Sequence, residues 1–334
     1  MGEKQRNQKN KKELPFVSVC TPTFNRRPFF PAIIKCFKWQ DYPQDRIEWI
    51  IIDDGTDKIE DLVCDIPQVR YFKYDTQMTL GKKRNISNRE AKGEIIVYMD
   101  DDDYYCPTRV SHAVQMLKLH PTALCAGGSK QLIYFKHIDK MYQLGPYNNN
   151  HATAGTFAFR RKLLEITSFE DNAALAEERH FLKDYTIPFV QLDYKQTSLM
   201  FSHRHNTYDK KELLVNPNPQ LTKPVDIAAD SIIKDENLYH FYINEIESLL
   251  KDYSPGDPTM KPEVLRQQKE MKALRNKQQP TFTATLPNGD TKTYTMNEMI
   301  EIMNSKEKQI GHLTEELQCK MAEIENLRRQ LKTT

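Results

Sequence analysis

The chain has 334 residues, and its 48 Lys and Arg against 46 Asp and Glu leave a formal net charge of +2. This balance excludes the bulk positive charge that drives nonspecific binding to nucleic acid. No apolar run reaches the roughly 18 residues of a membrane span, and the N-terminus lacks the apolar stretch of a signal peptide. The six cysteines form no CxxC pair, which favours free thiols in a reducing compartment. The sequence therefore predicts a cytoplasmic protein of about two domains, without an integral membrane segment and without a nucleic-acid partner.

The chain begins with a strongly basic segment. Residues 1–12 carry five Lys and Arg against one Glu, and after Met1 they have nothing apolar to bury. We expect residues 1–14 to form a disordered basic arm. Without the +4 of residues 1–12 the rest of the chain carries about −2, so the predicted folded part is slightly acidic.

Apolar β-branched runs and helical stretches alternate over the next two hundred residues. Strands alternating with helices at this spacing predict an α/β domain with a parallel sheet, here over residues 15–215. Trp39, at the end of the first helix, is expected in the core. The predicted strands are 16–20, 47–52, 69–74, 94–99, 123–128, 130–137, a strand that begins near 154, and 197–207. The predicted helices are 32–40, 81–92, 111–120, the stretch up to 165, and 177–185.

The composition changes beyond this domain. Residues 216–280 are predicted as a helical linker region with one amphipathic helix over 226–252. Its Pro- and Gly-containing stretch at 253–262 is expected to break helical structure.

A hairpin and a long helix are predicted at the C-terminal end. Thr-rich alternating segments around Asn288-Gly289 predict a β-hairpin over 281–295. In residues 296–334 apolar side chains recur every seven positions, which predicts a coiled coil and a homo-oligomer. Lys306 and Lys320 weaken the seam, and an amphipathic helix folded back on the domain is the alternative. The heptad residues are Met296, Met303, Ile310, Leu317, Ile324 and Leu331, with Leu313 and Leu327 between them.

Polar residues follow three of the predicted strands. The first strand ends in TPTFNR, the second in Asp53-Asp54, and the strand at 94–99 in the four aspartates 100–103. In open α/β sheets, ligands bind beyond the carboxyl ends of the strands. Adjacent carboxylates repel unless a cation neutralises them, and Mg²⁺ or Mn²⁺ with oxygen ligands suits this role. An acidic run in a solvated loop is the alternative.

A basic helix start precedes the acidic strand by one helix. Lys82 and Arg84 at this helix N-terminus suit a diphosphate, whereas Lys83 is expected on the solvated face. The phosphate-binding patterns GxxxxGK[ST] and GxGxxG are both missing from the sequence.

Taken together, the runs VSVCTPTFNRRPFF, IEWIIIDDGT, GKKRNIS and IVYMDDDDYY resemble a GT-A glycosyltransferase of the family 2 type. The similarity covers roughly residues 15–210 and is greatest to the versions encoded by giant DNA viruses. The resemblance implies a GT-A fold, which is a Rossmann-like mixed sheet, here with a C-terminal helical extension. It also implies a nucleotide-diphospho-sugar donor, usually linked to UDP, and the host cytoplasm as the location if the protein is viral.

The resemblance assigns a donor site to the strand ends. Asp102 is the expected metal ligand of the family's DxD pattern, with Asp100 near the ribose and the metal. Because the four aspartates are consecutive, the register can shift by one residue, which also brings Asp101 into the donor site. The remaining donor-site residues that the resemblance implies are Thr21, Thr23 and Arg26 around the nucleotide, Asp53 or Asp54 at the uracil N–H, and Arg84 at base or phosphate.

The resemblance also assigns the catalytic groups. Inversion needs a base that removes the proton of the acceptor hydroxyl. The family places an acidic pair at a helix start near the acceptor, which here is Glu177-Glu178, with Glu178 the first choice. Two carboxylates that only favour the helix dipole are the alternative. On the late strand, His203 is expected beside the metal and diphosphate, with His205 as the alternative.

The sequence thus predicts an inverting, metal-dependent hexosyltransferase-type enzyme that uses Mn²⁺ or Mg²⁺. Its acceptor is a glycan, a protein or a lipid. A sugar-phosphate nucleotidyltransferase is a competing possibility, but that class needs a Gly-rich loop after the first strand, and TPTFNR has no glycine. A non-catalytic scaffold that assembles through the coiled coil is the third possibility.

Overall fold

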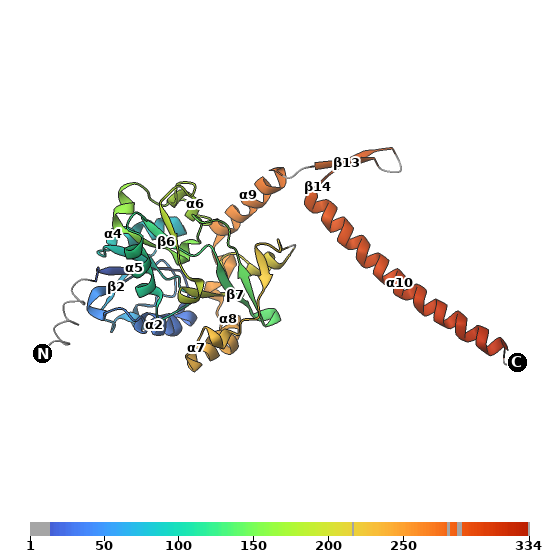
Figure 1. The fold of residues 1–334 in the computed structure, drawn as a ribbon, viewed down its shortest axis with the longest axis horizontal. Coiled ribbons are helices and arrows are strands. Elements are labelled where there is room, and N and C mark those ends of the chain that lie inside the picture. The colour runs from blue at the N-terminus through green and yellow to red at the C-terminus, as the bar shows by residue number, and fades with distance from the viewer. Residues whose placement is uncertain (1–13, 216, 279–280, 286–288, 333–334) are drawn as a thin grey trace. The chain divides into compact units, whose positions relative to one another are not determined.

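A seven-stranded sheet with the strand order β10-β6-β9-β4-β1-β2-β3 organises the first of two units of the chain, residues 1–265 (Figure 1). The structure is a computed structural model that describes residues 14–215, 217–278, 281–285 and 289–332, so the predicted basic arm lies outside it except for Leu14. Strands β4, β1, β2 and β3 are parallel, whereas β9 runs antiparallel to both β4 and β6. The predicted α/β fold is confirmed, as a mixed sheet. The strands are β1 (Val17–Thr23), β2 (Ile47–Asp53), β3 (Val69–Lys73), β4 (Ile95–Tyr98), β6 (Cys125–Gly127), β9 (Ala158–Arg160) and β10 (Phe189–Gln191).

Helices cover both faces of this sheet. Because successive strand residues point to opposite faces, β1 and β2 contribute to two separate apolar clusters. One cluster contains residues of α2 (Phe30–Lys38) and α5 (Arg109–Leu119), and the other contains residues of α4 (Leu80–Glu90) and α6 (Glu178–Phe181). The remaining helix of this region is α3 (Glu60–Val63). The two helical layers explain why every residue of β1 and β2 is buried.

The two tryptophans differ in burial, and Trp39 is not where the sequence predicted it. Trp49 on β2 is fully buried and stacks on Phe37 of α2, with ring centroids 4.6 Å apart. Trp39, expected in the core, is 43% exposed, and the Lys35 ammonium lies 4.6 Å from its ring centroid. It directly follows the last residue of α2.

A second sheet of five strands, in the order β12-β8-β7-β11-β5, lies beyond the first. Its strand β5 begins directly after the four aspartates and pairs with β11, which precedes His203. The second sheet therefore brings the predicted histidine strand next to the acidic run. Its strands are β5 (Tyr104–Tyr105), β7 (Gln131–Phe135), β8 (Lys140–Leu144), β11 (Ser198–Ser202) and β12 (Thr222–Pro224).

The compact unit extends to Leu265 instead of ending near residue 215. The helix expected over 226–252 is broken into α7 (Glu236–His240), a π-helical turn (Phe241–Glu245) and α8 (Ile246–Lys251). Tyr242, Ile246 and Leu250 are buried in the main core, and Tyr242 stacks on Phe201 of β11 with centroids 4.5 Å apart. Residues 222–265 are thus part of the domain, because their apolar face completes its core.

The second unit, residues 266–334, contains most of α9 (Pro262–Gln278), a hairpin and a long helix. The hairpin expected over 281–295 is present as β13 (Thr281–Thr285) paired with β14 (Thr291–Thr295), although Asn288 of its turn lies outside the described residues. The helix α10 (Met296–Lys332) exposes its heptad side chains, for example 64% of Met303 and 64% of Ile310. The side chains of Leu327 and Leu331 lie outside the described residues. Within the described part of the chain, no helix combines the length and apolar character that crossing a membrane requires.

Candidate active site

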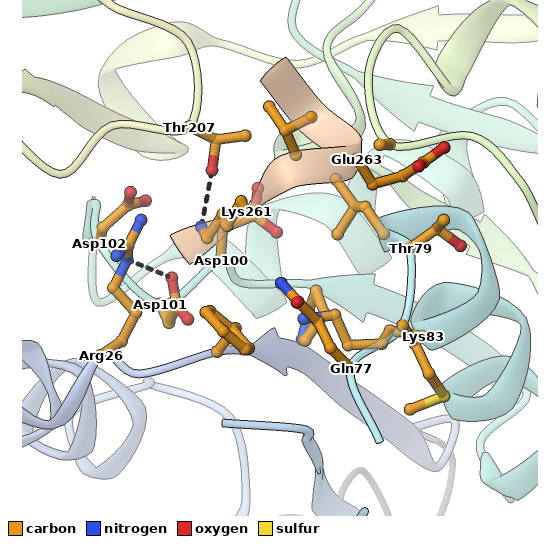
Figure 2. Close-up of a pocket in the computed structure, with 16 residues that line it drawn as sticks. Arg26, Gln77, Thr79, Lys83, Asp100, Asp101, Asp102, Thr207, Lys261 and Glu263 are labelled. Carbon is orange, nitrogen blue, oxygen red and sulfur yellow. Dashed lines mark hydrogen bonds and ion pairs between the residues drawn. The ribbon is translucent and has the colours of Figure 1, made fainter. Parts of the chain in front are cut away.

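The carboxyl ends of β1 and β4 border a cavity of about 390 Å³ (Figure 2). The register pairs Cys20 with Tyr98, so TPTFNR and the four aspartates leave neighbouring strands at the same sheet edge. Figure 2 shows aspartates on one side of this cavity and cations around it. Its charged lining residues are Arg26, Lys83, Asp100, Asp101, Asp102, Lys261 and Glu263. The cavity has the size and the location that α/β sheets use to bind ligands.

Each of the four aspartates has a separate partner. The pairs are Asp100 with Arg84 (3.2 Å), Asp101 with Arg26 (3.7 Å), Asp102 with His203 (3.3 Å) and Asp103 with Lys210 (3.7 Å). Burial, together with the neighbouring carboxylates, raises the pKa of Asp101 to about 6 and that of Asp103 to about 7. The local cations therefore only partly offset the crowding of these carboxylates.

Asp102 and His203, the two residues expected at a metal, contact each other directly. The Nε2 atom of His203 lies 3.3 Å from Oδ2 of Asp102 and 2.8 Å from Nδ2 of Asn206. Burial lowers the pKa of His203 to about 4, so its imidazole is neutral at pH 7. Although burial opposes ionisation of Asp102, the hydrogen bond from His203 holds the pKa of this carboxyl well below its usual range.

The donor set suits a hard divalent cation that shares its coordination shell with a bound ligand. Among the described residues, no group of three or more His, Cys, Asp and Glu side chains is arranged to hold an ion by itself. Three consecutive carboxyls nevertheless line the cavity, and burial raises the pKa of Asp101, so a bound cation would favour its ionised form.

The basic side of the cavity differs from the sequence prediction. Lys83, expected in solvent, is buried, lines the cavity and donates to Asp54 at 2.8 Å and to the Thr23 carbonyl at 3.1 Å. Lys82, expected at the diphosphate, is exposed and lies outside the cavity lining. The helical period explains the difference, since the inward face of α4 carries Lys83 and the buried Ser87 one turn later.

Several predicted nucleotide contacts serve the scaffold instead. Asp53 accepts hydrogen bonds from the amides of Gly55 and Ile59 and from the Tyr71 hydroxyl, so both its oxygens are used within the protein. The Thr21 hydroxyl donates to the Met99 carbonyl at 2.7 Å and accepts from the indole of the buried tryptophan on β2. Asp53 and Thr21 are therefore placed behind the cavity lining, and they hold β1, β2 and β4 in register.

Arg84 links the acidic run to the predicted catalytic pair. Its Nε donates to Glu177 at 3.0 Å, its Nη2 lies 3.2 Å from Asp100, and its guanidinium packs 4.5 Å from the Tyr98 ring centroid. A second cavity of about 250 Å³ is lined by Asp100, Asp102 and Glu177, among others. The two cavities share Asp100 and Asp102, so the acidic run lies between them.

The two members of the acidic pair occupy different environments. Glu177 is buried and bound to Arg84, whereas Glu178 begins α6 and is partly exposed. Burial and the adjacent charge of Glu177 raise the pKa of Glu178 to about 7. A carboxylate with this pKa is poised to accept a proton near neutral pH.

The sequence analysis missed two groups of site residues. Lys83 was assigned to solvent, and Lys261 belongs to the stretch at 253–262 that was expected only to break helical structure. Phe24 also lines the cavity, and the ammonium groups of Lys83 and Lys261 each lie 5.8 Å from its ring centroid. A lysine among prolines carries no periodic signal, so only the three-dimensional fold places Lys261 at the site.

A mixed α/β sheet with carboxylates and cations at the carboxyl ends of its parallel strands defines a GT-A-like fold. Residues 18–167, somewhat less than half of the chain, match the family model "Glycosyl transferase family 2". This agrees with the resemblance seen in the sequence. The segment matched ends well before the last residues that line the cavity.

Similar curated proteins are bacterial glycosyltransferases. The poly(ribitol-phosphate) beta-N-acetylglucosaminyltransferase TarS of Staphylococcus aureus is 27% identical over 108 residues, which are 31% of this chain and 19% of TarS. The putative colanic acid biosynthesis glycosyl transferase WcaA of Escherichia coli is 33% identical over 105 residues, which are 30% of this chain and 37% of WcaA. The chain therefore spans well under half of the length of these two relatives.

Solved structures include two similar proteins. The mannosyltransferase PcManGT of Pyrobaculum calidifontis, in complex with GDP-Man and Mn²⁺, has a TM-score of 0.48 at 17% identity and covers 79% of this chain and 81% of its own. TarS residues 1–349 in complex with UDP-GlcNAc have a TM-score of 0.42 at 18% identity and cover 55% of this chain and 58% of their own.

Proposed function

We propose that the protein is an inverting glycosyltransferase that transfers a sugar from a nucleotide-diphospho-sugar, a UDP-sugar by preference, to an acceptor hydroxyl. The observation that carries the proposal is the cavity at the strand ends of a family 2 domain, where Asp100, Asp101 and Asp102 face Arg26 and Lys83. Carboxylates for a metal and cations for a diphosphate are both needed in this reaction, and a solvated acidic loop needs neither.

Asp102, with His203 beside it, is the group that would hold Mn²⁺ or Mg²⁺. A bound divalent ion would stabilise the negative charge that develops on the leaving diphosphate. Asp100 is anchored by Arg84 at 3.2 Å, which keeps its carboxylate directed toward the border of the two cavities. Arg26, beside Asp101, and Lys83 line the same cavity, where they would bind the nucleotide and its phosphates.

Glu178 is the proposed general base. It would take the proton of the acceptor hydroxyl as the acceptor oxygen bonds to the anomeric carbon, while the bond from that carbon to the diphosphate oxygen breaks. The diphosphate leaves with the electron pair of this bond. The pKa of Glu178, raised to about 7, supports this residue as the base over Glu177, which is already bound to Arg84. Glu177 then acts as a positioning residue that fixes the start of α6.

Titration of the protein with UDP in the presence and absence of Mn²⁺, followed by thermal unfolding, tests the donor proposal. Binding to the folded state alone stabilises a protein by about 2.7 kcal/mol at a ligand concentration of 100 times Kd. We expect UDP to raise the unfolding temperature with Mn²⁺ and to have a much smaller effect with chelator. No stabilisation by UDP, GDP or any other nucleoside diphosphate would overturn the proposal and favour a non-catalytic scaffold.

We also propose that α10 assembles the protein into a homo-oligomer. Ile310, Leu313 and Leu317 are each more than half exposed, and apolar heptad positions of this kind are normally covered by a second helix. Three predictions rest on the sequence alone. They are the acceptor (a glycan, a protein or a lipid), the resemblance to viral family members, and the cytoplasmic location.

A further inference from the structure

The segment 253–264, which we call the strap, forms one wall of the nucleotide cavity. It lies well beyond residues 18–167 that define the family domain, yet Lys261, Glu263 and Val264 line the same cavity as Arg26 and Asp101. Figure 2 shows Lys261 and Glu263 of the strap at the cavity, and the Gln77 amide donates to the Met260 carbonyl at 3.2 Å. The strap therefore completes a site that the family segment leaves open.

The strap is anchored to the loop after β1. The Tyr253 hydroxyl donates to Asp57 at 2.9 Å, and the Asn25 side chain donates to the Pro255 carbonyl at 2.8 Å. The Arg26 guanidinium donates to the Gly256 carbonyl at 3.1 Å. A Cβ atom on Gly256 would lie 2.6 Å from the Asn25 carbonyl oxygen, so only glycine fits there. The strap is thus held directly against the loop that carries Arg26.

These contacts of the strap place the Lys261 side chain at the cavity. Its Nζ lies 2.9 Å from the Thr207 hydroxyl, and Arg26 and Lys83 line the same cavity. Arg26 pairs with Asp101 and Lys83 pairs with Asp54, but among the described residues no carboxylate lies within ion-pair distance of the Lys261 ammonium. Asp101 and Asp102 attract this ammonium, but its burial and the positive charges of Arg26 and Lys83 oppose them, so an anion that enters the cavity would stabilise it.

We propose that Lys261 binds the diphosphate of the donor and that the strap closes the donor site over it. The inference rests on the proposed function, because it takes a nucleotide-diphospho-sugar as the occupant of this cavity. The compact ammonium would act as a point charge on the phosphate oxygens, in the same cavity as Lys83. Thr207 holds the side chain until the phosphates replace it as the partner.

Binding of UDP, UMP and inorganic pyrophosphate to the full chain, measured by calorimetry with Mn²⁺, tests the role of Lys261. In K261M we expect Kd for UDP and for pyrophosphate to rise about 10- to 100-fold, because a charge-assisted hydrogen bond is lost, while UMP binding changes much less. K261R should retain most of the affinity. The control K223M, which removes an exposed lysine on β12, should bind all three ligands like the wild type.

The outcomes separate this inference from the proposed function. If the wild type binds UDP and K261M binds it equally well, Lys261 is not a diphosphate ligand, while the proposed function stands. If K261M weakens UMP as much as UDP, the residue only supports the fold of the cavity, and the inference is wrong. If the wild type binds neither UDP nor pyrophosphate, the proposed function and the inference fall together.

Discussion

Arg84 and Glu177 are 93 residues apart in the sequence and form an ion pair with an Nε–Oε1 distance of 3.0 Å. Both side chains are buried, and the same guanidinium also contacts Asp100. The pair ties the inward face of α4 to the start of α6, and so it connects the predicted donor residues to the predicted base. The positions of Asp100 and Glu178 both depend on it.

Replacing Arg84 with Met should strongly destabilise the protein. The change leaves the buried carboxylate of Glu177 without its cation and deprives Asp100 of its partner. Breaking a buried pair in this way costs about 3–5 kcal/mol. Urea unfolding measures the effect. R89M on the same helix is the control, since Arg89 is 68% exposed and its loss should change the unfolding free energy by only about 0.5 kcal/mol. Equal stability of R84M and R89M would refute the structural role.

Glu178→Gln should abolish transfer and leave donor binding intact. Without a base, the turnover number should fall by about 10²- to 10⁴-fold, because proton removal from the acceptor is lost. Calorimetric titration with UDP should give an unchanged Kd. Glu177→Gln serves as the contrast, since it should lower stability through Arg84. Substantial transfer by E178Q would show that the base is another residue.

The rate should depend on the ionisation of Glu178. A base works only when it is deprotonated, and the pKa of Glu178 is raised to about 7. The turnover number should therefore rise with pH, reach half of its maximum near neutrality and level off above it. A pH profile at saturating donor and acceptor measures this. A profile that is flat from about pH 5 to about pH 9 would argue against Glu178.

The heptad face of α10 should hold the chains together. Replacing both Ile310 and Leu317 with Lys places charges in the apolar seam, which should dissociate the oligomer to monomers. Sedimentation velocity measures the mass. The control replaces His312 and Gln318, which lie off the seam, with Lys and should keep the wild-type mass. A wild type that is already monomeric would disprove the assembly.

The sequence predicted the framework of the site because strand ends carry a clear pattern. The apolar runs that end at Asp53 and Asp100 form β2 and β4, and parallel packing on β1 brings their carboxyl ends to one edge. The contact between Asp102 and His203 follows from the pairing of β5 with β11. The chemistry of the two residues suggested a shared metal site, but the sheet that joins them was not predicted.

The remaining features depend on tertiary packing. Lys82 and Lys83 are adjacent and chemically identical, so only the orientation of α4 on the sheet decides which of them is buried. Asp53 and Thr21 have the chemistry of ligand contacts, but hydrogen bonds inside the scaffold use their oxygens. Lys261 reaches the cavity only because the residues after 215 complete the core and turn back to the loop at Asn25.

The most direct test measures nucleoside diphosphate release from a panel of nucleotide sugars with Mn²⁺ present, for the wild type and for Asp102→Asn. We predict that the wild type releases UDP from at least one UDP-sugar and that D102N releases none above background, because the residue proposed to hold the metal is gone. Failure to turn over any nucleotide sugar, or a D102N variant as active as the wild type, would contradict the proposed function.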